Sequence, residues 1–140
     1  MRFWDTSALV PRFLDEARAA DVKRWYLSDP ETVVWSLTRV ELISAIARRH
    51  REKPEFGKLW DAAIRNVLAA WQEWSEVTDF DRVRKAAERL VGVHPLRAAD
   101  ALQLGAAVVI AEGNPQSLEF VTLDRRLAEA AHSEGFPVLI

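Results

Sequence analysis

Short apolar stretches that alternate with helical segments are the feature that most constrains the fold of this 140-residue chain. Stretches rich in β-branched and aromatic residues predict strands at residues 3–4, 32–36, 75–78, 118–123 and 136–140. Apolar residues at helical spacing predict helices at 7–14, 16–27, 37–50, 56–74, 82–91, 94–112 and 124–135. Strands that alternate with helices favour a mainly parallel sheet covered on both faces. We therefore expect an α/β fold, a three-layer α/β/α sandwich.

The size and composition of the chain bound its class. A length of 140 residues with 49% hydrophobic residues suits one folded domain, residues 1–140, and argues against disorder. The chain has no cysteine, which excludes disulfides and thiolate metal sites. The longest apolar stretch, 104–111, is too short to span a bilayer, and the N-terminus lacks the apolar core of a signal peptide. We expect a cytoplasmic protein with no membrane segment.

Four acidic residues occupy positions where a carboxylate is costly. Asp5 ends the first predicted strand and Asp124 ends the fourth. Because ligands of open α/β sheets bind beyond the carboxyl ends of the strands, we expect these two side chains at one edge. Glu41, in "RVELISA", and Asp100, in "LRAADALQLGAA", lie inside apolar helical segments.

These four acids would repel one another unless a cation bound between them. Oxygen ligands without a cysteine or histidine cluster suit Mg²⁺ or Mn²⁺. The histidines do not offer such a cluster, because His50, His94 and His132 are scattered along the chain without ligand spacing.

Each acid also has an ordinary structural explanation. Asp5 and Asp124 are well placed to cap the helices that follow them. Glu41 could pair with Arg39 or Arg48 on an exposed helix face, and Asp100 could pair with Arg97. Each explanation is the more economical one for a single residue, whereas the four acids together are harder to explain by coincidence.

The four acidic motifs together resemble the PIN domain family. The motifs are "FWDTSALV", "RVELISA", "LRAADALQLGAA" and "FVTLDRRLAEAA", and they span nearly the whole chain. The resemblance is greatest to small bacterial and archaeal toxins of the VapC type. It implies a hydrolase that cleaves RNA with one or two Mg²⁺ or Mn²⁺ ions, a cognate antitoxin as partner, and an antitoxin peptide held in a hydrophobic groove.

The resemblance also assigns roles to individual residues. It implies that Asp5, Glu41 and Asp100 hold a metal ion, directly or through water, and that Asp124 serves a second ion or its water. Near these acids lie hydroxyl groups that could orient the carboxylates and arginines that could guide the RNA backbone: Thr6, Ser7 and Thr122, and Arg12, Arg39 and Arg97. The arginine pairs Arg48-Arg49 and Arg125-Arg126 are interpreted as solvated helix ends.

Tryptophans are the remaining feature of note. Trp60, Ile64, Val67 and Trp71 fall at helical spacing and predict a packing stripe. The wider set is more aromatic surface than one small core needs, which predicts an exposed apolar face, a homodimer and an antitoxin-binding surface: Trp25, Trp35, Trp60, Trp71 and Trp74.

Other functions remain open at this stage. A phosphatase could use Asp5 as its nucleophile, although phosphatases of the dehalogenase type carry a second aspartate where this chain has Ser7. The chain could also be a PIN-type RNA-processing nuclease outside a toxin–antitoxin pair, or a partner-binding module without catalysis.

Overall fold

The computed structural model describes residues 1–14 and 16–140 of the chain. Its strands are β1 (Arg2–Trp4), β2 (Thr32–Trp35), β3 (Ser75–Val77), β4 (Glu119–Val121) and β5 (Val138–Leu139). Its α-helices are α1 (Thr6–Leu14), α2 (Ala19–Ser28), α3 (Thr38–Glu52), α4 (Gly57–Trp71), α5 (Phe80–Val93), α6 (Ala98–Ala111) and α7 (Arg125–Ser133). Short 3₁₀ turns lie at Pro54–Phe56 and Pro115–Ser117.

The strands form one parallel sheet in the order β3-β2-β1-β4-β5. Phe3 of β1 lies opposite Val33 on one side and Phe120 on the other. The chain builds the sheet outward from β1 to β3 and then returns to add β4 on the other side of β1. The sheet therefore has a topological switch point between β1 and β4, where α/β proteins place their ligand sites.

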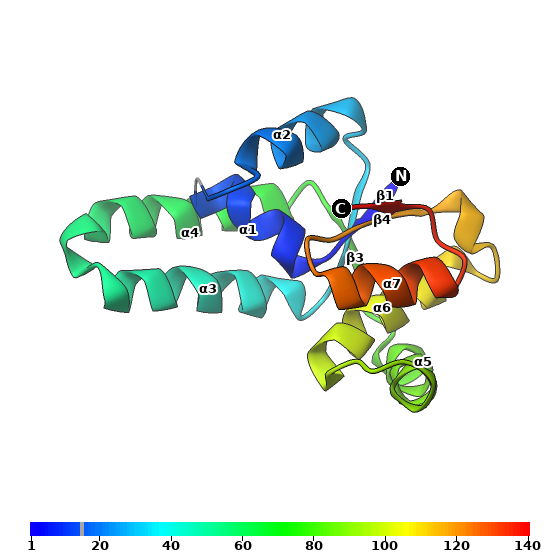
Figure 1. The fold of residues 1–140 in the computed structure, drawn as a ribbon. Helices are drawn as coiled ribbons and strands as arrows, with labels where there is room; N and C mark the ends of the chain where they lie inside the picture. Colours follow the sequence, from blue (N-terminus) through cyan, green and yellow to red (C-terminus); the bar gives the residue numbers. More distant parts are fainter. Residues whose placement is uncertain (15) are drawn as a thin grey trace.

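Successive side chains along a strand point to opposite faces of the sheet and pack into two separate cores, as Phe3 and Trp4 of β1 show. Phe3 stacks on Phe120 at a centroid distance of 5.3 Å, in the core that packs against α5, α6 and α7. Trp4 joins the core built with α1 to α4. Figure 1 shows the two groups of helices on opposite sides of the strands. The predicted three-layer α/β/α arrangement is confirmed.

The predicted helix 94–112 begins later, at Ala98. Pro95 disfavours helical backbone in the residue before it, and His94 is accordingly extended, with φ −121° and ψ 149°. The helix α6 that results has 14 residues, fewer than the 19 of the predicted helix. Within the described residues, no helix has both the length and the apolarity needed to cross a bilayer.

Helical spacing in the sequence places Leu37, Val40, Ile43 and Ala47 on one face of the helix at 37–50 and predicts that this face is buried, but α3 is oriented differently. The helix instead buries Thr38, Leu42 and Ile46, and Val40 is 63% exposed. Both sets of residues have helical spacing, and packing of α3 against α1 and α4 selects between them. The rotation turns Glu41 toward the switch point.

The tryptophans belong to the interior, and the predicted exposed aromatic face is wrong. Trp35 is 1% exposed, and Trp60, Trp71 and Trp74 are each 7% exposed, whereas Trp25 is partly buried. The indole N–H groups of three of them find acceptors inside the chain, such as the Lys53 carbonyl at 2.9 Å from Trp60. Trp35 packs in the core with α5–α7, and Trp60, Trp71 and Trp74 pack in the core among α1–α4. Among the described residues these tryptophans form no exposed patch, and the homodimer loses the observation on which it rested.

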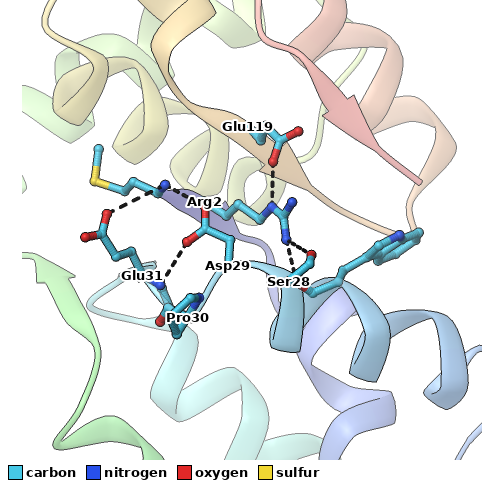
Figure 2. A network of polar contacts seen from close by, with 9 residues as sticks. Arg2, Ser28, Asp29, Pro30, Glu31 and Glu119 are labelled. Carbon is cyan, nitrogen blue, oxygen red and sulfur yellow. Dashed lines mark hydrogen bonds and ion pairs between the residues drawn. The ribbon is translucent and has the colours of Figure 1, made fainter.

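Arg2 connects several elements at the start of β1. The acids Asp5 and Asp124 lie at the opposite edge of the sheet, after the ends of β1 and β4. Its guanidinium pairs with Glu119 of β4 at 2.5 Å and donates to the Ser28 hydroxyl at 2.7 Å and to the Trp25 carbonyl. Figure 2 shows this network, with the N-terminal amine on Asp29 at 2.6 Å. The network joins β1, β4 and α2, and so fixes the strand that presents Asp5 at its other end.

Candidate active site

Asp5 lies directly after β1 and begins the turn into α1. Its Oδ2 atom accepts three hydrogen bonds, from the Ser7 backbone N–H at 3.2 Å, the Ser7 hydroxyl at 2.5 Å and the Thr122 hydroxyl at 2.9 Å. The bond from the Ser7 backbone caps α1, so the structural explanation of Asp5 holds in part. Capping needs only one oxygen of the Asp5 carboxylate. It does not explain why the fold buries a side chain that is charged when ionised.

Burial raises the pKa of Asp5 from 3.8 to about 6, although the hydrogen bonds from Ser7 and Thr122 oppose the shift. The charge of Glu41 adds a smaller upward contribution. Asp5 is only 5% exposed. Its ionised form is therefore unfavourable in the folded chain, and a proton or a cation would relieve the cost.

Glu41 enters from the first turn of α3. Its Oε2 atom accepts hydrogen bonds from the Thr6 hydroxyl and from Nε2 of Gln103 at 2.7 Å. The predicted alternative, a pair with Arg39 or Arg48, does not form in the part of the chain that the structure describes. Neutral donors thus hold the carboxylate of Glu41, which agrees with the apolar residues that surround it in the sequence.

Gln103 is a residue that the sequence analysis missed. It is 1% exposed, and its Nε2 atom also lies 2.8 Å from the Thr6 hydroxyl and 3.0 Å from the Thr38 hydroxyl. A signal was present, because Gln103 follows Asp100 by about one helical turn in an otherwise apolar segment. It acts on the site by fixing Glu41.

Asp100 and Asp124 complete the set from the other group of helices. Asp100 lies in the first turn of α6, and Asp124 caps α7 by accepting the Leu127 N–H at 3.0 Å. Partial burial raises the pKa of Asp100, and the charge of Asp124 raises it further, while Arg97 and Arg126 act in the opposite direction. The predicted capping role of Asp124 is therefore real, and it coexists with repulsion between the two carboxylates.

All four acids line a single cavity of about 750 Å³. They reach it from separate elements: the end of β1, the first turns of α3 and α6, and the residue before α7. Figure 1 shows the first turns of α1, α3 and α7 facing the same space. Thr6 and Ser7 also line the cavity, and Thr122 is fully buried beneath it.

The arginines that line the cavity differ from the predicted ones. Arg12, Arg39 and Arg97 are not among the lining residues, and Arg12 lies instead over the Tyr26 ring at 3.7 Å. Arg48 and Arg51 of α3 do line the cavity, although the sequence indicated a solvated helix end for Arg48. Their spacing of seven and ten residues from Glu41 places them on the same helix face, a signal that the sequence contained.

The carboxylates share a pattern that bears on metal binding. Protein donors hold Oδ2 of Asp5, Oε2 of Glu41 and Oδ1 of Asp124. Among the described residues, no donor contacts the second oxygen of any of the three. Over the same residues, no three acidic or histidine side chains are close enough to hold one ion as they stand. The donor set fits Mg²⁺ or Mn²⁺, because Mg²⁺ keeps several waters and binds through few carboxylates.

Comparison with known protein families decides the identity of the fold. The model of the PIN domain family matches residues 2–133. The chain belongs to the PIN domain family. The match includes all four acidic positions of this PIN domain, and no curated protein sequence matches the chain.

Solved structures similar to this PIN domain share its fold along nearly the full length. A toxin–antitoxin complex from Klebsiella pneumoniae is 17% identical, with a TM-score of 0.69 and coverage of 100% of this chain and 97% of that one. VapC20 of Mycobacterium tuberculosis, described as a sarcin-ricin loop cleaving toxin, is 20% identical, with a TM-score of 0.63 and coverage of 97% and 96%. FitAcB of Neisseria gonorrhoeae is 17% identical, with a TM-score of 0.64 and coverage of 100% and 97%.

Proposed function

We propose that this PIN domain is an endoribonuclease that hydrolyses RNA phosphodiester bonds with Mg²⁺ or Mn²⁺. The observation that carries the proposal is the meeting of Asp5, Glu41, Asp100 and Asp124 in one cavity at the switch point of the sheet. One or two divalent ions bound there would neutralise phosphate charge and lower the pKa of a bound water.

The residues around the acids prepare the site for that chemistry. Ser7 and Thr122 direct one oxygen of Asp5 inward, so that its other oxygen remains for a ligand. Thr6 and Gln103 do the same for Glu41. Fixed carboxylates need little reorganisation when a phosphate enters the cavity, which is the property that favours electrostatic catalysis.

We further propose that the chain is the toxin of a toxin–antitoxin pair, with a cognate antitoxin protein as its partner. Two similar structures support this proposal: one is described as a toxin–antitoxin complex, and the other as a toxin that cleaves the sarcin-ricin loop. An RNA-processing nuclease outside such a pair would use the same cavity. Co-expression with a candidate antitoxin tests the proposal, which requires that the antitoxin bind the chain and suppress its cleavage of RNA.

The other candidate functions have less support in the site. A phosphatase with Asp5 as nucleophile has less support, because Ser7 stands where phosphatases of the dehalogenase type carry a second aspartate, and no lysine is among the described lining residues. A binding module built on exposed tryptophans does not agree with their burial.

The decisive experiment incubates the purified chain with RNA in Mg²⁺, Mn²⁺ or EDTA. Cleavage that requires either ion supports the proposal, and no cleavage under any condition refutes it.

A further inference from the structure

One face of α3 connects the acidic cavity to positive charge. Glu41, Ser44, Ala45, Arg48 and Arg51 all line the same cavity. With a rise of about 1.5 Å per residue, Arg48 lies about 10 Å and Arg51 about 15 Å along the helix from Glu41. The face therefore begins with a carboxylate, continues with two small residues and ends with two guanidinium groups.

The two arginines are available to a ligand. Arg49 lies between them in sequence but contacts Glu16, and it pairs with Glu52 at 3.4 Å. Within residues 1–14 and 16–140, neither Arg48 nor Arg51 has an ion-pair partner, and both are exposed. The charges of Arg48 and Arg51 on the cavity side of α3 are thus uncommitted, whereas the charge of Arg49 is paired.

Stabilisation of the helix end is the simplest alternative explanation. Cations near a helix C-terminus interact favourably with its dipole. Arg49 and His50 already occupy the last turns of α3. The dipole also makes no distinction between faces of the helix, so it does not explain why Arg48 and Arg51 share the cavity face with Glu41.

We propose that Arg48 and Arg51 form a phosphate-binding track that holds the RNA strand along α3, on one side of the bond to be cut. The inference rests on the proposed ribonuclease function. A chain with net charge −2 and four acids in its cavity does not attract a polyanion by itself. Guanidinium groups bind phosphates through paired hydrogen bonds, and here they stand where phosphates neighbouring the reacting one would lie.

The test measures binding of a fluorescein-labelled single-stranded RNA of mixed sequence in Mg²⁺, by fluorescence anisotropy over a range of salt concentrations. The chain carries Asp100→Asn, so that the probe is not cut. To this background we add either Arg48→Gln with Arg51→Gln, or a matched control. The control, Lys58→Gln with Arg65→Gln, removes the same charge from exposed positions on α4 that do not line the cavity.

Loss of two phosphate contacts should make the slope of log K against log salt shallower by about 1.4, and should weaken binding about 25-fold at about 0.1 M salt. The control pair should change affinity by less than about twofold, since it makes no phosphate contact. Thermal unfolding of both variants confirms that the fold is intact.

Two results overturn the track while the ribonuclease function stands. In the first, the parent cleaves RNA with metal, but the Arg48 and Arg51 variant binds the probe as tightly as the background does. In the second, both charge-removing pairs weaken binding equally, which shows an effect of net charge alone. If the parent neither binds nor cleaves RNA, the proposed function fails, and the track fails with it.

Discussion

Replacement of Asp5 by asparagine should stabilise the metal-free protein at neutral pH and have little effect in acid. Asparagine keeps the size of the side chain and caps helices about as well as aspartate. What it removes is a charge that burial makes unfavourable, as the raised pKa of Asp5, about 6 instead of 3.8, records. The free energy of unfolding of the two proteins should therefore differ in a way that depends on pH.

The sign follows from proton binding. Between pH 3.8 and about 6 the folded parent binds more protons at Asp5 than the unfolded chain does, so the stability of the parent falls as pH rises through that window. Above the window the full cost remains, which a shift of this size puts at about 3 kcal/mol. The asparagine variant has no such cost. Its melting temperature should exceed that of the parent by about 10 °C near pH 7.5, and should equal it near pH 3.

The assay is thermal unfolding in EDTA at both pH values, with Asp61→Asn as the matched control. Asp61 is exposed on α4, so its replacement should change the free energy of unfolding by no more than about 0.5 kcal/mol at either pH. The reasoning is refuted if Asp5→Asn destabilises the protein at neutral pH, or if its effect is the same at both pH values. Added Mn²⁺ should stabilise the parent more than the variant, because only the parent keeps the full set of ligands.

Three other substitutions test the packing and positioning described above. Gln103→Met should lower RNA cleavage about 10- to 100-fold by releasing Glu41; unchanged cleavage kinetics in a folded variant would contradict this role. Gly105→Ala should destabilise the protein by about 1–3 kcal/mol in thermal unfolding, because the added Cβ would lie 3.0 Å from the Val83 carbonyl oxygen. At Gly92 an added Cβ meets nothing within 4 Å, so Gly92→Ala should stabilise the protein by about 0.5–1 kcal/mol. Equal effects of the two substitutions would disprove the close approach of α5 and α6. Glu134→Gln should lower the melting temperature at neutral pH but not near pH 3, because Arg89 and His94 hold the pKa of Glu134 below its usual value; a loss that persists in acid would exclude this ion pair as the cause.

The sequence predicted most successfully what depends on strand position. Asp5 and Asp124 follow strands that lie next to each other in a parallel sheet, so their meeting at one edge follows from the alternation of strands and helices. Glu41 and Asp100 could be singled out because each interrupts an apolar helical segment. The prediction of the α/β/α fold needed no more than the periodicity of the chain.

Features that depend on the rotation of a helix were harder to predict. The periodicity of α3 is compatible with burying either Val40 or Leu42, and tertiary packing decides between them. The same rotation brings Arg48 to the cavity and leaves Arg39 outside it. Likewise, the amide of Gln103 could be assigned to the site only after its partners on α1 and α3 were known.

The tryptophans show a third limit of sequence reasoning. Counting large aromatics against the size of one core predicted an exposed face, but the sheet separates two cores. Trp35 packs with α5–α7, whereas Trp60, Trp71 and Trp74 pack among α1–α4. Two cores accommodate more large side chains than one, so the surplus that the sequence indicated does not exist.

The most direct test of the account compares Mn²⁺ binding and RNA cleavage in the parent and in Asp5→Asn. Isothermal titration calorimetry measures binding of the ion, and a gel-based time course with the same preparations measures cleavage. The account predicts that the parent binds one or two ions and cleaves RNA only when they are present, and that the folded variant loses both properties together. Full cleavage by the Asp5→Asn variant, or cleavage by the parent in EDTA, would contradict it.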